Sequence, residues 1–481
     1  MDRKEGIVVA SIFAILLFTA NADEPSAESW SVHVDGRPLR LERQEILTYH
    51  KGKAPFVDDL KGGWYQYGRF TLRKPVEVRV SSTRSLSGLS VSPAKYGVVP
   101  KHVSDREVSF VAERPFHLSF ESNGRHGALL LFADEPIVAP PQAPDVVYYG
   151  PGEHVLAPVE LNLHSGQTLF LDEGAVLYGR VSSSGENVSI CGHGTISGAR
   201  FERFKGPRGY GFLWLHNATN VTVRGVAIAA PNKWSVAVKE CDGVVFDDVR
   251  VLGSNMINDD GIDVVNSRNV TIKHSFIRTQ DDNICTKGIC YPTRPEDGPP
   301  VENVRVEDCE LWCDGANVFR FGFECDASYM KGVTVRDVDV LHFSPVPNPP
   351  IEHIWSHAVF KIQPSDGMVF SGLDVKGVRI HSDGNDINLV IAEPRPMRVP
   401  RESWSNQYRY TRGGVIRSCR FEDISVDGEK GGFVGGIHLI GRTQKESVSD
   451  MHFSGIDYFG ETISSTSKCV NVGSYANGDF K

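Results

Sequence analysis

Three absences narrow the class of protein before any motif is considered. After the apolar run at residues 6–19, the 481-residue chain has no stretch that approaches the roughly 20 apolar residues of a membrane span. The formal net charge of -9 leaves no broad basic field, which argues against nucleic acids and anionic membrane surfaces as partners. There is also no Cys-x-x-Cys pair, which is the spacing typical of zinc sites. We therefore expect a soluble protein that binds no nucleic acid.

The cysteines are odd in number and widely spread, so they do not form a dense disulfide framework. Nine occur, all between Cys191 and Cys469. Five lie close enough in sequence to suggest zinc: Cys285, Cys290, Cys309, Cys313 and Cys325. Because no His partner stands at ligand spacing, we predict buried small hydrophobic cysteines, with room for one disulfide, and no metal.

The first 22 residues predict an export signal. Arg3-Lys4 is a basic start, residues 6–19 are the apolar run, and Ala20-Asn21-Ala22 fits a small-x-small cleavage site. An uncleaved anchor is the alternative, since the start also carries acidic residues. We expect residues 1–22 to be removed and the mature chain to be secreted, extracellular or periplasmic, with no membrane contact after signal cleavage.

Composition and patterning favour β-structure. The hydrophobic fraction of 40% and charged fraction of 23% are those of a globular protein, and 47 glycines favour a turn-rich one. Residues 29–141 contain short alternating runs such as Val76-Glu77-Val78-Arg79-Val80, as in an antiparallel sandwich. Four prolines at residues 136–144 mark a linker. We predict an N-terminal β-sandwich domain over residues 29–141.

A repeated phrase begins after the linker, an Asn or Gly followed by alternating apolar residues, as in Asn220-Val221-Thr222-Val223. Corresponding valines at positions 221, 244, 270, 304 and 333 are separated by 23, 26, 34 and 29 residues. Such a step suits one coil of a parallel β-solenoid, with three short strands and three turns. The Leu-x-x-Leu-x-Leu phrase of leucine-rich repeats is missing. The predicted fold is all-β, a right-handed parallel β-helix (solenoid) catalytic domain over residues 146–481 behind the small sandwich.

Two acidic clusters lie about one coil apart. Asp259-Asp260 is followed by Asp263, and Asp281-Asp282 comes 21 to 22 residues after Asp260. In a solenoid of that step the clusters stack, so their carboxylates come within several ångströms of each other. Like charges held that close cannot all ionise, and at least one pKa must rise. A protonated carboxyl beside an ionised one is the arrangement that hydrolyses glycosidic bonds.

The stretch 258–288 resembles the parallel β-helix glycoside hydrolases of the polygalacturonase family (family 28) and the dextranase family (family 49). The former carries Asn-Thr-Asp and, one coil later, Asp-Asp. Here Asn258-Asp259-Asp260 and Asp281-Asp282 stand in those places.

The resemblance implies an inverting hydrolase that cleaves O-glycosidic bonds of a polysaccharide or oligosaccharide, without a cofactor. Asp281 would be the general acid, and Asp260 and Asp282 would activate water. An inverting pair is expected to stand roughly 6.5–9.5 Å apart.

The chain also departs from the family 28 pattern. Polygalacturonases follow the Asp-Asp pair with a His-Gly and an Arg-x-Lys that handle the galacturonate carboxylate. Phe319-Arg320-Phe321-Gly322 stands in the first region, and Phe360-Lys361-Ile362-Gln363 matches the basic motif only in part. Galacturonate is therefore not predicted. The sandwich, together with Glu310-Leu311-Trp312 and the residues up to His342, is similar to the dextranase family.

Six further side chains are candidates for substrate binding: Lys287, Arg320, Glu324, His342, His357 and Trp355. Lys287 could contact sugar hydroxyls or pair with Asp282. Trp355 lies in an irregular region, where an aromatic ring either stacks on sugar or packs against the solenoid wall. For the others an ion pair or a core position is the structural alternative.

Three other functions fit parts of the pattern. Asp and Asn also cap the turns of solenoids, which would make the clusters structural. A β-helix polysaccharide lyase or epimerase would use calcium and a Lys, Arg or His base. A non-catalytic carbohydrate-binding solenoid would need no acid at all. Two clusters at one-coil spacing beside long loops favour catalysis.

Overall fold

The computed structural model describes residues 29–46, 63–122, 124, 126–201, 211–254, 256, 258–289, 297–344, 356–384, 387–396, 412–430 and 435–481. Within them the secondary structure consists of 39 strands and one 3-10 turn, η1 (Ala94–Tyr96). No helix in these ranges is long and apolar enough to cross a membrane. The export segment predicted at residues 1–22 lies outside the described residues.

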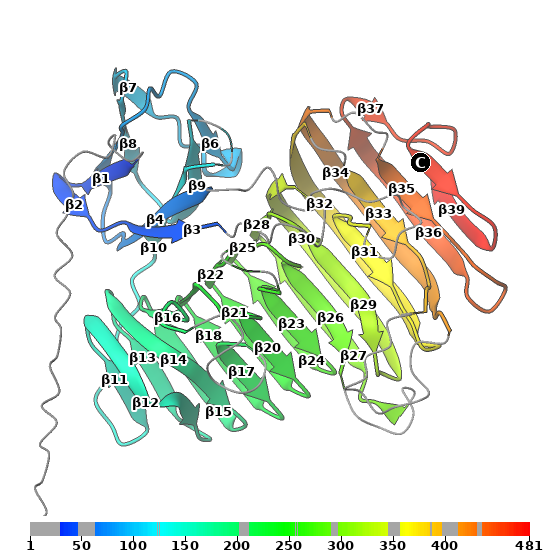
Figure 1. Cartoon of the computed structure of the whole chain (residues 1–481), viewed down its shortest axis with the longest axis horizontal. Coiled ribbons are helices and arrows are strands. Elements are labelled where there is room, and N and C mark those ends of the chain that lie inside the picture. The colour runs from blue at the N-terminus through cyan, green and yellow to red at the C-terminus, as the bar shows by residue number, and fades with distance from the viewer. Residues whose placement is uncertain are drawn as a thin grey trace, which may run out of the picture.

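The N-terminal sandwich is built from two five-stranded sheets around one apolar core (Figure 1). The first sheet has the order β2 (Arg37–Leu39), β1 (Trp30–Val34), β5 (Val76–Ser82), β8 (Glu107–Ala112), β7 (Lys101–Ser104). The second has the order β3 (Glu42–Glu45), β4 (Trp64–Thr71), β10 (Ala128–Asp134), β9 (Phe116–Glu121), β6 (Ser90–Ser92). Pairing is antiparallel except between β10 and β4, which run parallel.

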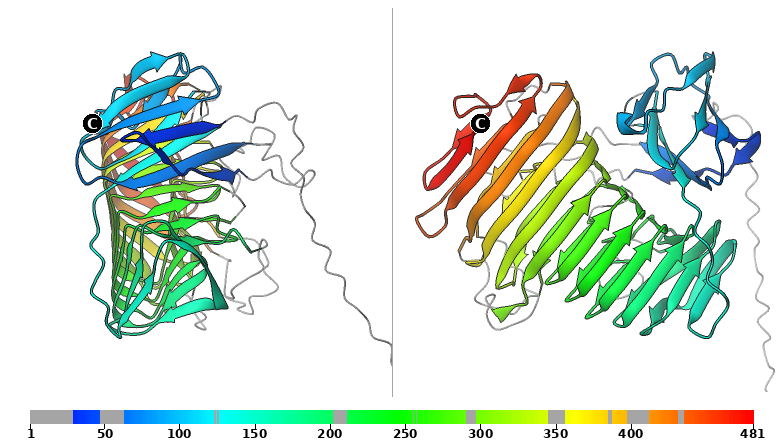
Figure 2. Two further views of the ribbon diagram at one scale, coloured as in Figure 1. Left: turned by 90° about the vertical axis from the view of Figure 1, so that its left-hand side faces the viewer. Right: turned by 180° about the vertical axis from the view of Figure 1, so that it is seen from behind.

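The rest of the described chain forms one 29-stranded stack of coils, and the predicted all-β fold with a parallel β-helix is confirmed (Figures 1 and 2). Its strands are β11 (Val146–Tyr149), β12 (Gly152–Leu163), β13 (Thr168–Leu171), β14 (Ala175–Ser183), β15 (Glu186–Gly192), β16 (Thr195–Ser197), β17 (Leu213–His216), β18 (Thr219–Arg224), β19 (Ala227–Ala229), β20 (Val236–Lys239), β21 (Asp242–Asp247), β22 (Arg250–Leu252), β23 (Ile262–Val265), β24 (Arg268–Lys273), β25 (Phe276–Thr279), β26 (Ile284–Gly288), β27 (Val301–Glu307), β28 (Glu310–Cys313), β29 (Phe319–Cys325), β30 (Tyr329–Phe343), β31 (Phe360–Gln363), β32 (Val369–Asp383), β33 (Asn388–Ala392), β34 (Val415–Glu429), β35 (Gly436–Leu439), β36 (Val448–Tyr458), β37 (Glu461–Thr462), β38 (Val470–Val472) and β39 (Ala476–Phe480).

The repeated phrase marks one position of successive coils. The predicted valines pair in parallel register from coil to coil: Val221, Val244, Val270, Val304 and Val333. All are buried in the core of the helix. The Asn or Gly before each one has a positive φ, which these two residues tolerate best: Asn220, Gly243, Asn269, Asn303 and Gly332. The phrase therefore encodes a left-handed turn residue followed by an inward-facing strand.

Two of the sheets along the helix matter for function. We call the row β17, β20, β23, β26, β29, β31, β33, β35 and β38 the site sheet. We call the row β16, β19, β22, β25, β28 and the end of β30 the docking sheet. The N-terminal sandwich lies against the docking sheet through a shared apolar cluster: Ile46, Tyr65, Ala128, Leu130, Phe132, Ala227, Ala229, Leu252, Phe276, Trp312 and Leu341.

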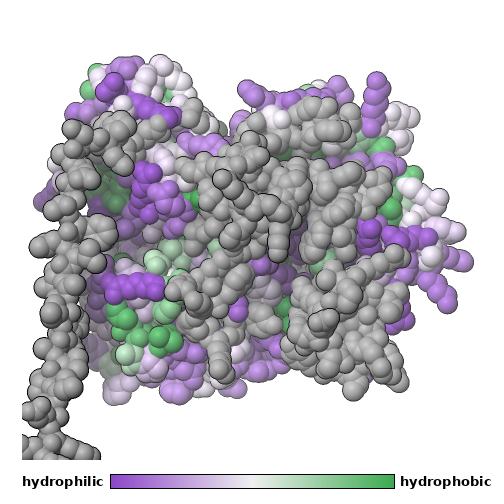
Figure 3. All heavy atoms as spheres, viewed as in Figure 1, coloured by the Kyte–Doolittle hydropathy of each residue, from purple (hydrophilic) through white to green (hydrophobic). Residues whose placement is uncertain are grey.

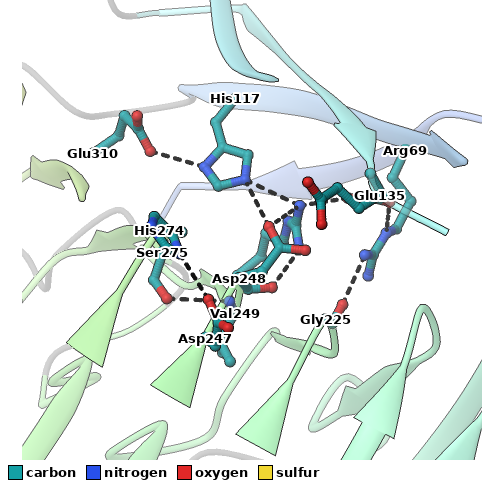
Figure 4. Close-up of polar contacts among 12 residues, drawn as sticks. Arg69, His117, Glu135, Gly225, Asp247, Asp248, Val249, His274, Ser275 and Glu310 are labelled. Carbon is teal, nitrogen blue, oxygen red and sulfur yellow. Dashed lines mark hydrogen bonds and ion pairs between the residues drawn. The ribbon is translucent and has the colours of Figure 1, made fainter. Parts of the chain in front are cut away.

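Polar contacts also join the sandwich to the β-helix (Figure 4). Arg250 of β22 ion-pairs with Asp134 of β10, and both side chains are 1% exposed. His117 of β9 lies between Glu310 and Asp248, with Nδ1 2.8 Å from Glu310 Oε2 and Nε2 3.2 Å from Asp248 Oδ1 (Figure 4). The sandwich and the helix are thus joined by both apolar and ionic contacts.

The outer surface differs between regions. In the view of Figure 3, hydrophobic residues gather over the first coils of the helix, around β11 to β14. Val155 and Val159 of β12 are among the exposed large hydrophobic residues there. Of the nine cysteines, the eight in the described ranges form no disulfide, and six of those eight are buried. The prediction of buried small hydrophobic cysteines is confirmed for those six.

Candidate active site

The two acidic clusters lie on neighbouring coils at the start of site-sheet strands. Ile262 pairs with Ile284, and the N–H of Gly261 donates to the carbonyl of Asp282 at 2.9 Å. This coil therefore has a step of 22 residues, which places Asp260 beside Asp282. The turn before each strand presents the carboxylates, and the strands behind it fix the backbone.

The three predicted catalytic carboxylates come together. One oxygen each of Asp260, Asp281 and Asp282 lies within 4.8 Å of the others. Coils at the usual strand spacing of about 4.8 Å account for this closeness. The closest oxygens are nearer than the roughly 6.5–9.5 Å expected for an inverting pair and resemble the ~5–5.5 Å of retaining enzymes. The predicted wide spread is not seen at the nearest oxygens.

Asp281 has the environment of a proton donor. It is half-buried, its Oδ2 accepts from the N–H of Asn258 at 3.2 Å, and its Oδ1 accepts from the N–H of Asp282 at 2.9 Å. Burial raises the pKa of Asp281 well above its usual range, and the charges of Asp260 and Asp282 raise it further. The group therefore retains its proton at pH values at which an exposed aspartate has lost it.

Asp260 lies in an ion-paired pocket of side chains. The Lys287 ammonium is 2.6 Å from Oδ2 of Asp260 and 2.7 Å from Oδ1 of Asp263, and it lies 4.0 Å from the ring centroid of Trp234. Burial raises the pKa of Asp260, while Lys287 opposes this rise. Oδ1 of Asp260 has no hydrogen-bond partner among the described residues. One oxygen is thus fixed by Lys287, and the other is buried without a partner in the described part of the chain.

Asp282 is held by the next coil. Its Oδ1 accepts from the backbone N–H of Asn317 at 3.0 Å and from Nδ2 of Asn317 at 2.6 Å. The Asn317 Oδ1 in turn accepts from the N–H of Ala358 at 3.0 Å, which fixes the amide orientation. The thiol of Cys285 lies 3.6 Å from the other Asp282 oxygen. Asp282 therefore has one firmly bound oxygen, and its other oxygen makes a weak contact with the Cys285 thiol.

By spacing alone the cluster could also hold a cation. Asp260, Asp281 and Asp282 form one possible ligand set, and Asp260, Asp263 and Cys285 form another. The second set already surrounds the Lys287 ammonium. Asp260 and Asp263 hold the pKa of Lys287 well above its usual range, although burial opposes them. At this second set the protein itself supplies a positive charge through Lys287.

Two basic residues lie in register beside the acids. Cys285 pairs with Arg320 and Arg320 with Lys361, so these side chains share one face of the site sheet. Arg320 donates to Gln363 Oε1 at 2.9 Å, and the Lys361 ammonium donates to Ser356 Oγ at 2.8 Å. Burial, together with the charge of Arg320, lowers the pKa of Lys361 to about 7. The partial match to the basic motif therefore does lie next to the acids.

The other predicted binding residues are placed differently. Glu324 lies on β29, and its charge acts to raise the pKa of Asp260. His357 precedes β31, is buried, and accepts from Nδ2 of Asn388 through its backbone carbonyl at 2.9 Å. Trp355 lies outside the described residues.

His342 lies in the docking sheet, away from the site sheet. Its Nε2 is 2.9 Å from Oε2 of Glu121 in the sandwich, and its ring is 4.0 Å from that of Trp312. The structure therefore brings His342 to the sandwich rather than to the carboxylates. The reason is that the end of β30 belongs to the docking sheet, so its outward-facing side chains meet β9.

Sequence reasoning did not find Asn317 or Trp234. Asn317 stands 35 residues after Asp282, because an insertion lengthens that coil, and no local motif identifies it. Trp234 precedes β20 by two residues, just as Asp260 precedes β23 by two, and this shared offset is a signal that could have found it.

Comparisons with known proteins find similarity to glycoside hydrolases in part of the sequence and in the fold. Residues 182–290, which contain all three carboxylates, match the model of Glycosyl hydrolases family 28. No curated protein matches the chain. The fold is similar to that of Dex49A from Penicillium minioluteum, with a TM-score of 0.65, 13% identity and 94% of both chains covered.

A Family 28 exopolygalacturonase from Yersinia enterocolitica is similar with a TM-score of 0.49 and 12% identity, over 84% of this chain and 97% of that one. A hyperthermoactive exopolygalacturonase from Thermotoga maritima is similar with a TM-score of 0.47 and 14% identity, over 69% and 80% of the chains. The expected resemblance to β-helix glycoside hydrolases of families 28 and 49 is confirmed.

Proposed function

We propose that this glycoside-hydrolase-like β-helix is an exported inverting hydrolase that cleaves an O-glycosidic bond next to an acidic sugar unit. The observation that carries the proposal is the contrast between two carboxyls on neighbouring coils. Asp281 is half-buried with a pKa well above its usual range, whereas Asp260 is ion-paired with Lys287. A carboxyl that keeps its proton beside an ion-paired carboxylate is the working pair of a glycosidase.

In the proposed reaction, Asp281 gives its proton to the glycosidic oxygen as the bond from that oxygen to the anomeric carbon breaks. A water attacks the anomeric carbon from the opposite face and loses one proton to Asp260 or Asp282. The products are a free reducing end and an alcohol on the leaving sugar. The proton later returns from the base to Asp281 through solvent.

The binding state of the two base candidates supports inversion. A nucleophile in a retaining enzyme needs one free carboxylate opposite the acid. Here Asp260 and Asp282 each have one firmly bound oxygen, while the other has no partner among the described residues in Asp260 and contacts the Cys285 thiol at 3.6 Å in Asp282. Two acceptors on adjacent coils can receive the two O–H groups of one water. This favours a held water over a covalent intermediate, although the closest oxygens are near the spacing of retaining enzymes.

An acidic substrate is supported by Arg320 and Lys361. Both are buried on the site-sheet face, and Nε of Arg320 and Nε2 of Gln363 are buried without a hydrogen-bond partner in the described ranges. Buried donors without partners are costly unless a ligand supplies acceptors. A carboxylate or sulfate group on the sugar next to the scissile bond would supply them.

The test is a screen of the purified mature chain against uronate-containing, sulfated and neutral polysaccharides, with reducing ends and ultraviolet absorbance read together. We expect new reducing ends on an acidic glycan and no new absorbance. Proton NMR of the first product should show the anomer opposite to that of the substrate. Retained configuration would overturn inversion, and no hydrolysis of any glycan would overturn the function.

Asp281→Asn provides the site-specific test. Loss of the general acid should lower kcat by roughly 10²–10⁴-fold while glycan binding and folding persist. Asp450→Asn is the matched control, because Asp450 is exposed and its carboxylate contacts the Ser418 hydroxyl and the His452 ring, far from the acidic clusters in sequence. Near-normal turnover by Asp281→Asn would remove Asp281 from the role of acid.

A lyase is the second candidate, and one observation favours it. The pKa of Lys361 is lowered to about 7, which suits a base that removes the proton next to a uronate carboxylate. A lyase product carries a new double bond and absorbs in the ultraviolet. Absorbance that rises in step with reducing ends, and is abolished in Lys361→Met, would select the lyase over the hydrolase.

A further inference from the structure

Asp259 is a fully buried carboxylate that the proposed mechanism does not use. It stands beside Asp281 in the register of the two coils. Its Oδ1 accepts from the N–H of Gln280 at 2.8 Å and from the N–H of Asp281 at 3.0 Å, and its Oδ2 accepts from the N–H of Ser254. Asp259 therefore ties the backbone of Asp281 to the segment that follows β22.

Ser254 connects this anchor to a second buried acid. Its backbone has a φ of 68°, a left-handed conformation that costs a non-glycine residue energy and persists only when its surroundings hold it. The Ser254 hydroxyl donates to Oδ2 of Asp314 at 2.6 Å. Asp314 also accepts from Nε of Arg278 at 2.9 Å and from Nε1 of Trp312 at 2.9 Å. All four polar side chains in this network, Asp259, Ser254, Asp314 and Arg278, are buried.

The network ends on a residue of the N-terminal sandwich. Tyr65 of β4 is fully buried, and its hydroxyl donates to the carbonyl of Gly253 at 2.9 Å. The centroid of its ring lies 4.3 Å from the guanidinium carbon of Arg278, and that carbon also lies 3.8 Å from the centroid of the Trp312 ring. Tyr65 thus holds both the backbone next to Ser254 and the cation that binds Asp314.

We infer that Tyr65 and Asp259 are positioning residues for Asp281, so that the N-terminal sandwich is a working part of the acid site rather than a separate module. The inference rests on the proposed function of Asp281 as the general acid. Neither residue reaches the reacting atoms. Tyr65 acts on Gly253 and Arg278, these fix Ser254 and Asp314, and Ser254 and Asp259 together fix the backbone of Asp281.

A departure from the family 28 motif supports the same assignment. Asp259 stands where that motif has a Thr, which offers one oxygen. An aspartate offers two, and the second one holds Ser254 in the segment that Tyr65 contacts. Gly253 fits the same arrangement, because a Cβ there would lie 2.6 Å from Oδ2 of Asp259.

The experiment compares Tyr65→Phe and Asp259→Asn with wild type in the full chain. Tyr65→Phe keeps the ring but removes the bond to Gly253, and we expect kcat to fall on the order of tenfold with KM unchanged. Asp259→Asn replaces one acceptor oxygen with an NH2 donor, so at least one of the three backbone anchors is lost, and kcat should fall about 100-fold, the cost of a misplaced acid. In the double variant kcat should fall by less than the product of the two single-variant decreases, because both residues act on Asp281 through the same chain of contacts.

Tyr96→Phe is the matched control. Tyr96 is another sandwich tyrosine whose hydroxyl donates to the β-helix, at 2.8 Å to Oε1 of Glu310, but this contact does not lead to Asp281. Tyr96→Phe should lower the free energy of unfolding by about as much as Tyr65→Phe does, and it should leave kcat unchanged. Equal kcat values for Tyr65→Phe, Tyr96→Phe and wild type would overturn the inference.

A readout that does not need activity separates the two proposals. The carboxyl of Asp281 is followed by carbon-13 NMR against pH in wild type and Asp259→Asn, with Asp281→Asn used to assign the signal. Because the Asp259 charge acts to raise the pKa of Asp281, its titration should move to lower pH in Asp259→Asn. An unmoved titration would overturn positioning even if hydrolysis is found. A moved titration without hydrolysis of any glycan would keep positioning and reject the function.

Discussion

The Lys287 ammonium lies 2.6 Å from Oδ2 of Asp260 in an ion pair from which water is almost excluded, since the two side chains are 6% and 4% exposed. The same ammonium is 2.7 Å from Asp263. At this depth the charge of one group sets the protonation of the other far more strongly than at a surface. Lys287 therefore opposes the rise that burial gives to the pKa of the proposed base, Asp260.

Lys287→Met should move the pH–rate profile to higher pH. The Lys287 charge lowers the pKa of Asp260. Without that charge Asp260 stays protonated up to a higher pH, so the acidic limb of the kcat/KM profile moves to higher pH. The same charge also lowers the pKa of Asp281, so the alkaline limb moves in the same direction. Steady-state kinetics against pH measure both limbs.

Lys287→Arg keeps the charge and should restore most of the profile. Lys331→Met is the control, because Lys331 pairs with Glu302 at a site where the side chains are 49% and 33% exposed. Unshifted limbs in Lys287→Met would show that the ion pair does not control the base.

Asn317→Ala should lower kcat more than it raises KM. The variant removes the 2.6 Å bond from Nδ2 to Asp282 and the link to Ala358, while the backbone N–H of residue 317 still reaches Asp282. A carboxylate that is free to rotate loses its alignment with water, at a cost of about 10- to 100-fold in kcat. Asn266→Ala is the control, since Asn266 is also buried but bonds to backbone groups of Ile289, Pro299 and Asp326. Equal losses in both variants would reduce Asn317 to a structural role.

The sequence predicted the parts of the site that depend on short-range spacing. The valine steps gave the coil register, and a coil without insertion set Asp260 beside Asp282. Asn317 follows an insertion, so its place in the stack depends on how many residues loop out, which local sequence does not encode.

Long-range contacts explain the other differences. His342 is one of the predicted candidates for substrate binding, with an ion pair as the alternative, and its neighbour Glu121 is 221 residues away in the sandwich. Tyr65 reaches Gly253 across 188 residues. Such pairs arise from how two domains dock, and neither periodicity nor a motif reports docking.

Asp134→Asn should destabilise the whole chain. Burial alone would raise the pKa of Asp134, but Arg250 and Arg69 outweigh it and hold that pKa below its usual value. Removing the carboxylate breaks one of the two ion pairs of the buried Arg250, the other being with Asp248, and breaking a buried pair costs about 3–5 kcal/mol. Denaturant unfolding followed by circular dichroism measures the loss.

The ion pair between Asp134 and Arg250 makes the free energy of unfolding depend on pH. A folded-state pKa below the unfolded value of about 3.9 gives stabilisation that is complete above that value and is lost as the pH falls towards the folded pKa. Wild type should therefore lose stability below about pH 4 more steeply than Asp134→Asn. Asp35→Asn is the control, since its pair with Lys74 is 63% and 71% exposed and worth little. Parallel curves for wild type and Asp134→Asn would contradict the assignment.

Lys361→Met should raise KM for an acidic glycan and flatten its dependence on pH. Below its pKa of about 7, Lys361 is charged and attracts a carboxylate or sulfate, and above that value it is neutral. In wild type KM should therefore increase as the pH rises through 7, because the binding-competent form is being lost. In Lys361→Met KM should be high throughout, and the neighbouring Arg320 should hold what affinity remains.

Lys376→Met controls for the loss of a positive charge, since Lys376 pairs with Glu422 and Asp423 on the exposed side of β32. A KM in Lys361→Met equal to that of wild type at pH 6 would mean that the Lys361 ammonium does not meet substrate. If the KM for an acidic glycan is unchanged in Lys361→Met, Arg320 is the remaining candidate for contacting the acidic group. Its Nε is buried and has no hydrogen-bond partner within the described part of the chain.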